Sequence, residues 1–256
     1  MNKPLIKSWS YSRLVEYELC PYRSKLKIID KIPEPDRPLP PGKTEHANDR
    51  GTRIHNELEN YIRGTGAFPK EAHRFELEVN AIKRAYEEGK VSLEGEWGFD
   101  RNWQPCDYKT AWLRVKLDVS YLRTKKHLIV VDYKSGRKDG NEIKHGEQVM
   151  LYGLCAAIRE PSVEVIDTEL YYLDQSPGDD GSKNFSSTSK PASKWLYHLK
   201  AFNNRGLKMT NATEFPPMPS AFACQWCPYK DGICEFAHSA KPVRRKGEVF
   251  VRRKGQ

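Results

Sequence analysis

Apolar residues recur at helical spacing in the first ninety residues. Residues 11–20 carry Tyr11, Val15 and Leu19 four positions apart and are followed by Pro21, which predicts a short helix that ends at Cys20. Residues 54–62 show the i, i+4, i+7, i+8 spacing of one apolar helix face, and a further helix is expected from residue 69 to Gly89. The proline-rich segment 33–42 between them predicts an extended surface loop.

The period changes from helical to two after residue 91. Residues 112–121 alternate apolar and polar side chains with Asp118 on the polar face, and residues 128–134 place Asp132 and Lys134 on one face. The short connection predicts an antiparallel hairpin. A helix over 142–159, with Gln148 and Tyr152 on one face, a strand over 163–173, a polar loop or disordered insertion over 174–190 and a helix over 193–204 follow. This order predicts an α+β or mixed α/β fold with one central sheet.

The charge balance suggests a polyanionic partner. The chain has 43 Lys+Arg against 34 Asp+Glu, a net charge of +9. No run approaches 18 apolar residues, and the N-terminus has no secretory apolar segment, so an intracellular, soluble protein that does not contact membranes is expected. Residues 241–254 contain seven basic residues and one glutamate; phosphate binding and solvated disorder are equally compatible with this tail.

Two carboxylates and a lysine form the first chemical pattern. Asp118 and Asp132 on neighbouring strands, with Lys134 two residues further, have the ligand types that suit Mg²⁺ and the cation that can stabilise a phosphate transition state. Asp-x-Lys alone is equally typical of ordinary charges at a strand end. His55 lies one position off its apolar helix face, with Gly51 one turn earlier where the chain can approach another element closely; it is either a ligand or a surface residue.

A cysteine pattern near the C-terminus indicates a metal centre. Cys224, Cys227 and Cys234 follow C-x2-C-x6-C, and thiolates two residues apart can point at one metal. His238 would complete a local zinc module, whereas Cys20 would complete a four-thiolate site suited to zinc or an iron–sulfur cluster. Of the two remaining cysteines, Cys155 is expected in the core.

The ordered motifs resemble a known family. They are Ser10 to Leu14 leading to Cys20-Pro21, Gly51-x3-His55, Asp118, Asp132-Tyr133-Lys134, Gln148-x3-Tyr152 and the three terminal cysteines. Over residues 8–236 the chain resembles the RecB/AddB-like branch of the PD-(D/E)XK nuclease superfamily, in particular its iron–sulfur exonucleases, which include the AddB nuclease domain and small CRISPR-associated enzymes.

The resemblance implies a restriction-endonuclease-like αβββαβ core with a mixed central sheet, N-terminal helices and a C-terminal iron–sulfur region. It implies that His55, Asp118, Asp132 and the Tyr133 carbonyl hold Mg²⁺ or Mn²⁺, with Lys134 as the catalytic lysine. Gln148 and Tyr152 would position the active site or DNA. A structural [4Fe–4S] cluster would be held by Cys20, Cys224, Cys227 and Cys234. A further metal-binding glutamate would be Glu94 or Glu96, and the choice between them stays open.

The expected protein is therefore a metal-dependent DNA exonuclease, acting on single-stranded ends in recombination, repair or processing. One nuclease domain over residues 1–240 and a basic tail over 241–256 are expected. Arg114 and Lys116 are candidate DNA contacts, and Trp112 and Trp226 candidate base-stacking residues, although packing is favoured for Trp226. A homo-oligomer or a recombination or helicase partner is left open. The alternative is a non-catalytic nucleic-acid-binding protein with a C-terminal Zn²⁺ module.

Overall fold

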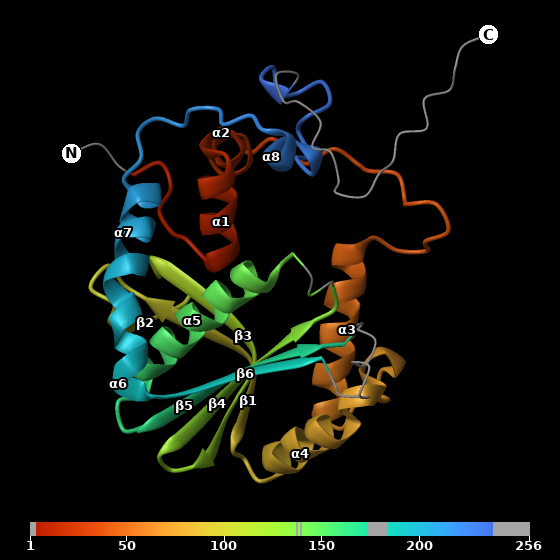
Figure 1. The fold of residues 1–256 in the computed structure, drawn as a ribbon, viewed down its shortest axis with the longest axis vertical. Helices are drawn as coiled ribbons and strands as arrows, with labels where there is room; N and C mark the ends of the chain where they lie inside the picture. Colours follow the sequence, from red (N-terminus) through yellow and green to blue (C-terminus); the bar gives the residue numbers. More distant parts are fainter. Residues whose placement is uncertain (1–3, 137, 139, 174–183, 238–256) are drawn as a thin grey trace. The chain divides into compact units, whose positions relative to one another are not determined.

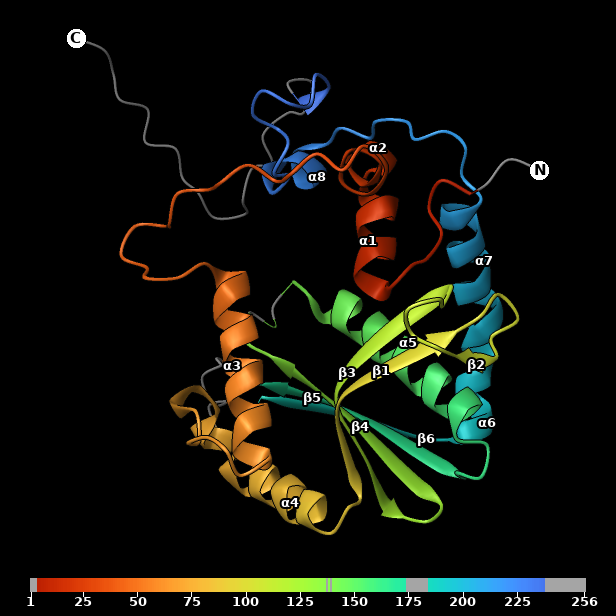
Figure 2. The ribbon, with the colours of Figure 1, turned by 180° about the vertical axis from the view of Figure 1, so that it is seen from behind.

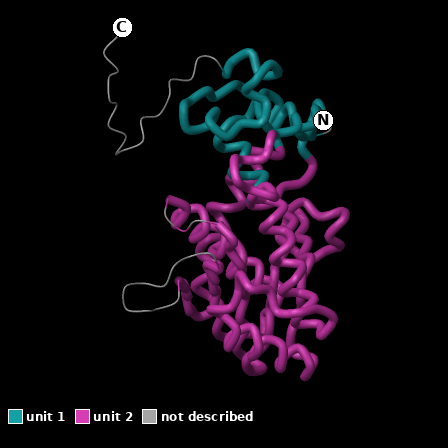
Figure 3. Tube along the Cα trace, turned by 90° about the vertical axis from the view of Figure 1, so that its right-hand side faces the viewer, with its two compact units in different colours: residues 1–6, 12–37, 211–256 teal, residues 7–11, 38–210 magenta. Residues whose placement is uncertain are grey.

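The computed structural model describes residues 4–136, 138, 140–173 and 184–237. The chain forms two compact units (Figure 3). We call residues 7–11 and 38–210 the sheet unit, and residues 1–6, 12–37 and 211–256 the cysteine unit. His238 and the basic tail over 241–256 lie outside the described residues, so the expectations placed on them stay predictions.

The sheet unit is built on a mixed six-stranded sheet of order β2-β1-β3-β4-β5-β6. The strands are β1 (Val91–Phe99), β2 (Pro105–Cys106), β3 (Leu113–Thr124), β4 (His127–Lys134), β5 (Val165–Tyr172) and β6 (Phe185–Pro191). The β4–β5 pair is parallel and the other pairs are antiparallel. β3 and β4 form the predicted hairpin, and the helix between β4 and β5 supplies the crossover that a parallel pair requires.

Helices cover both faces of this sheet (Figure 1, Figure 2). On one face lie α3 (Ala47–Ile62), the 3₁₀ segment η2 (Lys70–Phe75) and α4 (Glu76–Glu87). On the other lie α5 (Glu142–Arg159), α6 (Ala192–Trp195), η3 (Leu196–His198) and α7 (Leu199–Thr210). β4 is buried at all six internal positions because both of its faces are covered, whereas β3 alternates as its sequence predicts.

The main core lies between the sheet and the α3–α4 layer. Ile54, Leu58 and Ile62 of α3 pack there against Val119 and Val131 of the hairpin, as the apolar periods predict. On the opposite face Gly153 of α5 lies against the buried ring of Trp195, where an added Cβ would be 2.5 Å from the indole Cδ2. Cys155 is fully buried, as predicted.

The element order confirms the αβββαβ expectation, since α4, β1, β3, β4, α5 and β5 follow one another with only the two-residue β2 inserted. Three details differ from the sequence prediction. Residues 70–75 form a 3₁₀ segment before α4, and the last helix is three successive pieces that extend to Thr210. Of the expected loop over 174–190, residues 174–183 lie outside the described residues, and the part from residue 185 onward belongs to β6. β6 has few apolar residues because its side chains alternate between exposed and half-buried positions on an edge strand.

The cysteine unit joins the two ends of the chain. It contains α1 (Tyr11–Leu19) from residue 12 onward, α2 (Pro21–Ser24), the π-helical turn η1 (Lys25–Ile29) and α8 (Ala221–Gln225). The Tyr229 hydroxyl donates to the Ile32 carbonyl at 2.8 Å, and the Tyr22 and Phe236 rings meet edge to face at 5.1 Å. These contacts hold the segment after residue 211 against the segment that begins the chain.

Two expectations for tryptophans are wrong. Trp226, expected to pack between its cysteines, is 65% exposed, because α8 ends there with its side chain facing outward. Trp112, a candidate for base stacking, is 4% exposed, and its indole N–H donates to Thr210 inside the sheet unit. Within the described part of the chain, every helix is too short or too polar to cross a membrane.

Candidate active site

The site begins where the β3–β4 ladder ends. Val119 and Val131 are the last paired residues, and the next position on β3 is Asp118. The carboxylate Oδ2 of Asp118 accepts the backbone N–H of Tyr133 at 2.7 Å, so a side chain replaces the backbone acceptor at this point. The strands separate here without leaving a buried N–H unpaired.

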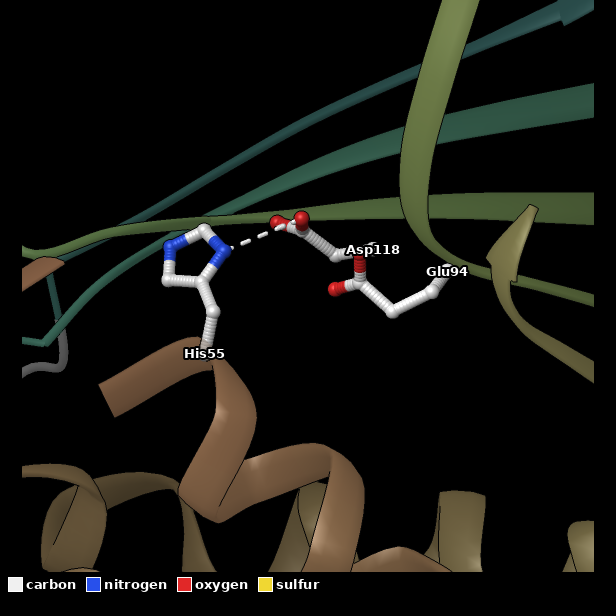
Figure 4. Close-up of side chains that lie close together, drawn as sticks. All are labelled: His55, Glu94 and Asp118. Atoms are coloured by element: carbon white, nitrogen blue, oxygen red, sulfur yellow. Dashed lines mark hydrogen bonds and ion pairs between the residues drawn. The ribbon is translucent and has the colours of Figure 1, made fainter. Parts of the chain in front are cut away.

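His55 reaches Asp118 from helix α3. Its Nδ1 donates to Asp118 Oδ1 at 3.0 Å (Figure 4). The neighbours Ile54 and Leu58 are fully buried and fix this face of α3 on the sheet. Gly51 lies one turn earlier, where an added Cβ would be 2.9 Å from Ser135 Oγ, so the glycine allows α3 to approach the end of β4. The sequence prediction of a close approach at this glycine is confirmed.

Glu94 on β1 completes a group with His55 and Asp118. One potential ligand atom from each of the three lies within 4.8 Å of the others (Figure 4). Glu94 has a positive φ of 48° and interrupts the β1–β3 ladder at the position facing Asp118. Such a backbone conformation is costly for a non-glycine residue and is common at functional sites. Glu96 is exposed, so between the two candidate glutamates the structure brings Glu94 to the site.

A second group lies beside the first and is organised by helix α5. Asp132 is 4% exposed, and its Oδ2 forms an ion pair with the Lys134 ammonium. Lys134 also donates to Gln148 Oε1 at 2.9 Å. Gln148 donates in turn to Asp132 Oδ1 at 3.4 Å and to the Tyr152 hydroxyl at 2.6 Å. The four predicted residues therefore form one continuous hydrogen-bonded network.

Lys116 connects the two groups. Its ammonium pairs with Glu94 at 2.6 Å, while its backbone carbonyl accepts the Tyr152 hydroxyl at 3.1 Å. Arg114, the other candidate DNA contact on this strand, is held over the Tyr108 ring with 5.7 Å between guanidinium and ring centre. All six residues predicted as catalytic thus lie in one connected site, and Tyr133 adds a backbone N–H.

Burial and neighbouring charges shift the pKa values of two groups in the site. Burial raises the pKa of Asp132 and the Asp118 charge raises it further, against the opposing effect of Lys134. Burial lowers the pKa of His55, but the hydrogen bond and charge of Asp118 outweigh it, so the pKa of His55 is raised. The Asp118 charge therefore makes the ionised form of the buried Asp132 harder to keep, and a bound cation would favour that ionised form.

The donor set fits a hard divalent cation. Carboxylate oxygens are the preferred ligands of Mg²⁺ and Mn²⁺, and a neutral imidazole is a common additional ligand. The buried Asp132 Oδ2 has the Lys134 ammonium as its partner, so a cation bound at this oxygen would share it with the lysine. Asp132 lies outside the 4.8 Å group of His55, Glu94 and Asp118.

The four cysteines predicted as ligands line one small cavity of the cysteine unit. Burial raises the pKa of Cys227, and the charges of Cys234 and Cys20 raise it further, so these thiols are neighbours. No three of these sulfurs lie within 4.8 Å of one another in the described part of the chain. Four thiolates around one zinc ion at 2.3 Å would be about 3.8 Å apart.

Glu94 is the site residue that sequence reasoning left unresolved. Gly95 beside it was the available signal, because a glycine inside a strand often marks a bulge. The periodicity of β1 gave no reason to prefer position 94, since both Glu94 and Glu96 occupy the polar face of a regular strand.

The chain belongs to the PD-(D/E)XK nuclease superfamily, whose sequence profile matches residues 8–235. No curated protein matches significantly. Among solved structures, protein SSO0001 is 13% identical with a TM-score of 0.45, covering 90% of this chain and 86% of its own. The alkaline exonuclease LHK-Exo of Laribacter hongkongensis is 15% identical with a TM-score of 0.28, covering 78% and 91%. Its complex with dAMP is 15% identical with a TM-score of 0.27, covering 80% and 93%. The protein is thus a nuclease of mixed α/β fold, and the family assignment rests on the sequence match.

Proposed function

We propose that this nuclease is a divalent-metal-dependent deoxyribonuclease that removes nucleotides from single-stranded DNA ends during recombination, repair or DNA processing. The observation that carries the proposal is the convergence of two aspartates, a glutamate, a histidine and a lysine where β3 and β4 separate. The net charge of +9 supports a polyanionic substrate.

In this proposal His55, Glu94, Asp118 and Asp132, with the Tyr133 carbonyl, hold Mg²⁺ or Mn²⁺. A bound ion of this kind lowers the pKa of a coordinated water and neutralises phosphate charge. Asp118 also orients His55 through the hydrogen bond to its Nδ1. Its side chain accepts the Tyr133 N–H in place of a backbone carbonyl and so spaces β3 from β4 at this point.

Lys134 supplies the cationic group that meets the negative charge developing on the phosphate. Asp132 and Gln148 fix its ammonium from two sides. Tyr152 holds Gln148 at 2.6 Å and is anchored on the Lys116 carbonyl. Gln148 and Tyr152 are therefore positioning residues, which keep Lys134 in place without touching the phosphate.

We further propose that Cys20, Cys224, Cys227 and Cys234 hold a structural [4Fe–4S] cluster, as in the RecB/AddB-like branch. Their shared cavity supports a common metal centre, and the resemblance to the iron–sulfur nucleases favours a cluster over a single zinc ion. Anaerobic purification should give a brown protein, and Cys20→Ala should remove the colour whereas Cys106→Ala should not. A colourless zinc protein that depends on His238 and not on Cys20 would contradict the cluster.

Digestion of end-labelled DNA tests the nuclease proposal directly. Linear single-stranded, linear double-stranded and circular substrates are incubated with Mg²⁺, Mn²⁺ or EDTA. We expect release of nucleotides from linear single strands with either metal and none in EDTA. Asp132→Ala and Lys134→Ala should abolish digestion while retaining DNA binding. An inactive wild type that still binds DNA would instead support the non-catalytic nucleic-acid-binding protein.

A further inference from the structure

A second cavity lies on the α3–α4 face of the sheet, separate from the proposed metal ligands. Its volume is about 470 Å³, and it is open to solvent. It is lined by residues of η2, α4 and strands β3, β5 and β6, namely Phe75, Glu78, Ala81, Tyr121, Arg123, Glu169, Tyr171 and Phe185. Four of these side chains are aromatic, and Phe185 is 42% exposed on the edge strand. We call this the aromatic cavity.

The aromatic cavity contains a buried carboxylate. Glu169 is 7% exposed, and its Oε2 accepts the Tyr171 hydroxyl at 2.9 Å. Burial raises the pKa of Glu169 against the opposing effects of this hydrogen bond and of Arg123. The charges of Asp167 and Glu78 raise it further. The carboxylate therefore has fewer donors around it than its ionised form requires.

A buried tyrosine hydroxyl without a hydrogen-bond partner in the described chain lies on a ring that packs near the cavity wall. Tyr133 is 3% exposed, and its hydroxyl makes no hydrogen bond within the described chain. Its ring lies 5.9 Å from the ring of Tyr171, which lines the cavity. Unpaired buried polar groups of this kind are rare and call for a partner that the protein itself does not supply.

The aromatic cavity is close to the proposed active site. The Tyr133 ring lies 5.9 Å from the His55 ring on one side and 5.9 Å from the Tyr171 ring on the other. The His55 and Tyr171 rings are therefore at most about 12 Å apart, a length that three or four stacked nucleotides cover at about 3.4 Å each. A strand whose phosphate lies at the metal site can bring a nearby base to the cavity.

The charge of the aromatic cavity selects among the parts of a nucleotide. Two carboxylates, Glu78 and Glu169, line the cavity beside one cation, Arg123, which also pairs with Asp167 at 3.6 Å, so a group rich in N–H donors is favoured there over a phosphate. An ionised carboxylate only accepts hydrogen bonds. Guanine presents two adjacent donors, N1–H and the 2-amino group, to one carboxylate, and its flat ring suits an aromatic wall.

We propose that the aromatic cavity binds an unstacked base of the DNA strand and favours guanine, with Glu169 accepting N1–H and the 2-amino group. This inference rests on the proposed DNA nuclease function. Tyr121 and Phe185 provide ring surface for the base. The enzyme accordingly prefers guanine at a nucleotide close to the cleaved bond.

Titration calorimetry in EDTA tests the pocket without requiring cleavage. Full-length protein is titrated with dGMP, dIMP, dAMP, dCMP and dTMP at up to millimolar concentration. Inosine lacks the 2-amino group, so dIMP should bind about tenfold more weakly than dGMP, as expected for losing half of a paired contact. Glu169→Gln should remove the preference for dGMP, and Phe185→Ala should weaken the binding of all five nucleotides.

The matched control is Glu164→Gln, which changes an exposed carboxylate one residue before β5 and should leave the titrations unchanged. Three results would overturn the proposed guanine pocket. They are equal dissociation constants for all five nucleotides, no binding of any of them, and unaltered binding of dGMP to the Glu169→Gln variant.

Two further results separate the pocket from the nuclease proposal. Lys134→Ala should keep the dGMP preference while losing digestion. A wild type that selects dGMP but digests no DNA would contradict the proposed function alone.

Discussion

Replacement of Asp118 by Asn tests whether this carboxylate organises the site. Asp118 accepts two hydrogen bonds, from His55 and from the Tyr133 N–H, and asparagine retains the shape but only one acceptor oxygen. Its amide nitrogen must then face one of the two donors. A hydrogen bond to a charged group contributes about 1.5–3 kcal/mol. The substitution also removes the repulsion that raises the pKa of Asp132, which offsets part of this loss. We expect a net destabilisation of about 1–2 kcal/mol in EDTA.

The histidine provides the sharper measurement. In the wild type the pKa of His55 is raised because Asp118 outweighs burial. In the Asp118→Asn variant the burial effect remains and its main opponent is gone, so the pKa of His55 should fall below its ordinary value of about 6.5. Because the pKa of His55 is higher in the folded state than in the unfolded state, its protonation stabilises the fold at any pH below the unfolded pKa. This stabilisation is lost as the pH rises through the pKa of the folded state. The stability difference between wild type and variant should therefore be largest below about pH 6.5.

NMR titration of the His55 ring protons in metal-free protein checks both the direction and the pH window. Denaturant unfolding at pH 5.5 and pH 8.5 gives the matching stabilities. Asp107→Asn, at an exposed loop carboxylate, is the control and should leave the His55 titration unchanged. An unaltered His55 pKa in Asp118→Asn would refute the pairing on which the site geometry depends. Activity with Mg²⁺ should fall at least about a hundredfold, since a metal site contributes several kcal/mol to a transition state.

Three further outcomes are expected. Gly153→Ala should destabilise the protein by about 2 kcal/mol, because the new Cβ would lie 2.5 Å from Cδ2 of the Trp195 ring and this overpacking costs more than the gain in helix propensity. Gly146→Ala on the same helix meets nothing within 4 Å and should stabilise the protein by up to about 1 kcal/mol. Denaturant unfolding measures both changes in stability. Lys134→Met should raise the pKa of Asp132 further, which infrared titration of the carboxyl band detects, and an unchanged band would contradict the ion pair. Mg²⁺ at a hundredfold its dissociation constant should stabilise the wild type by about 2.7 kcal/mol and leave Asp118→Asn nearly unchanged in a thermal scan; equal shifts would place the ion elsewhere.

The sequence predicted most elements of the sheet unit because their patterns are local. Apolar and polar residues alternate on both sides of Asp118, and one side of β3 is buried as this pattern predicts. The apolar residues spaced around His55 form the buried face of α3, also as predicted. Helical periodicity placed Gln148 and Tyr152 on one face, and the family resemblance assigned that face to the site. These predictions succeeded because burial on one side of an element leaves a period in its own sequence.

The remaining features depend on contacts that no single segment records. Glu94 reaches the site through a positive φ that a regular strand does not predict, and β6 forms because β5 offers an unpaired edge to a polar segment. The exposure of Trp226 depends on where α8 ends, not on its two neighbouring cysteines. The aromatic cavity gave no signal, because Phe75, Tyr121 and Phe185 each read as ordinary core or edge residues.

The arrangement of charge explains why a site of this kind belongs at the divergence of two strands. A continuous ladder would pair every backbone N–H and leave the carboxylates to be solvated by water alone. At the end of the ladder, Asp118 satisfies one N–H and still faces Glu94 and His55, so negative charge concentrates at a place that secondary structure keeps rigid. Burial raises the pKa of Asp132, and the Asp118 charge raises it further. Lys134 opposes this rise, and a bound cation would act in the same direction as the lysine. Removing either should therefore shift the protonation of Asp132 in the same direction, which links the lysine and the metal to one electrostatic balance.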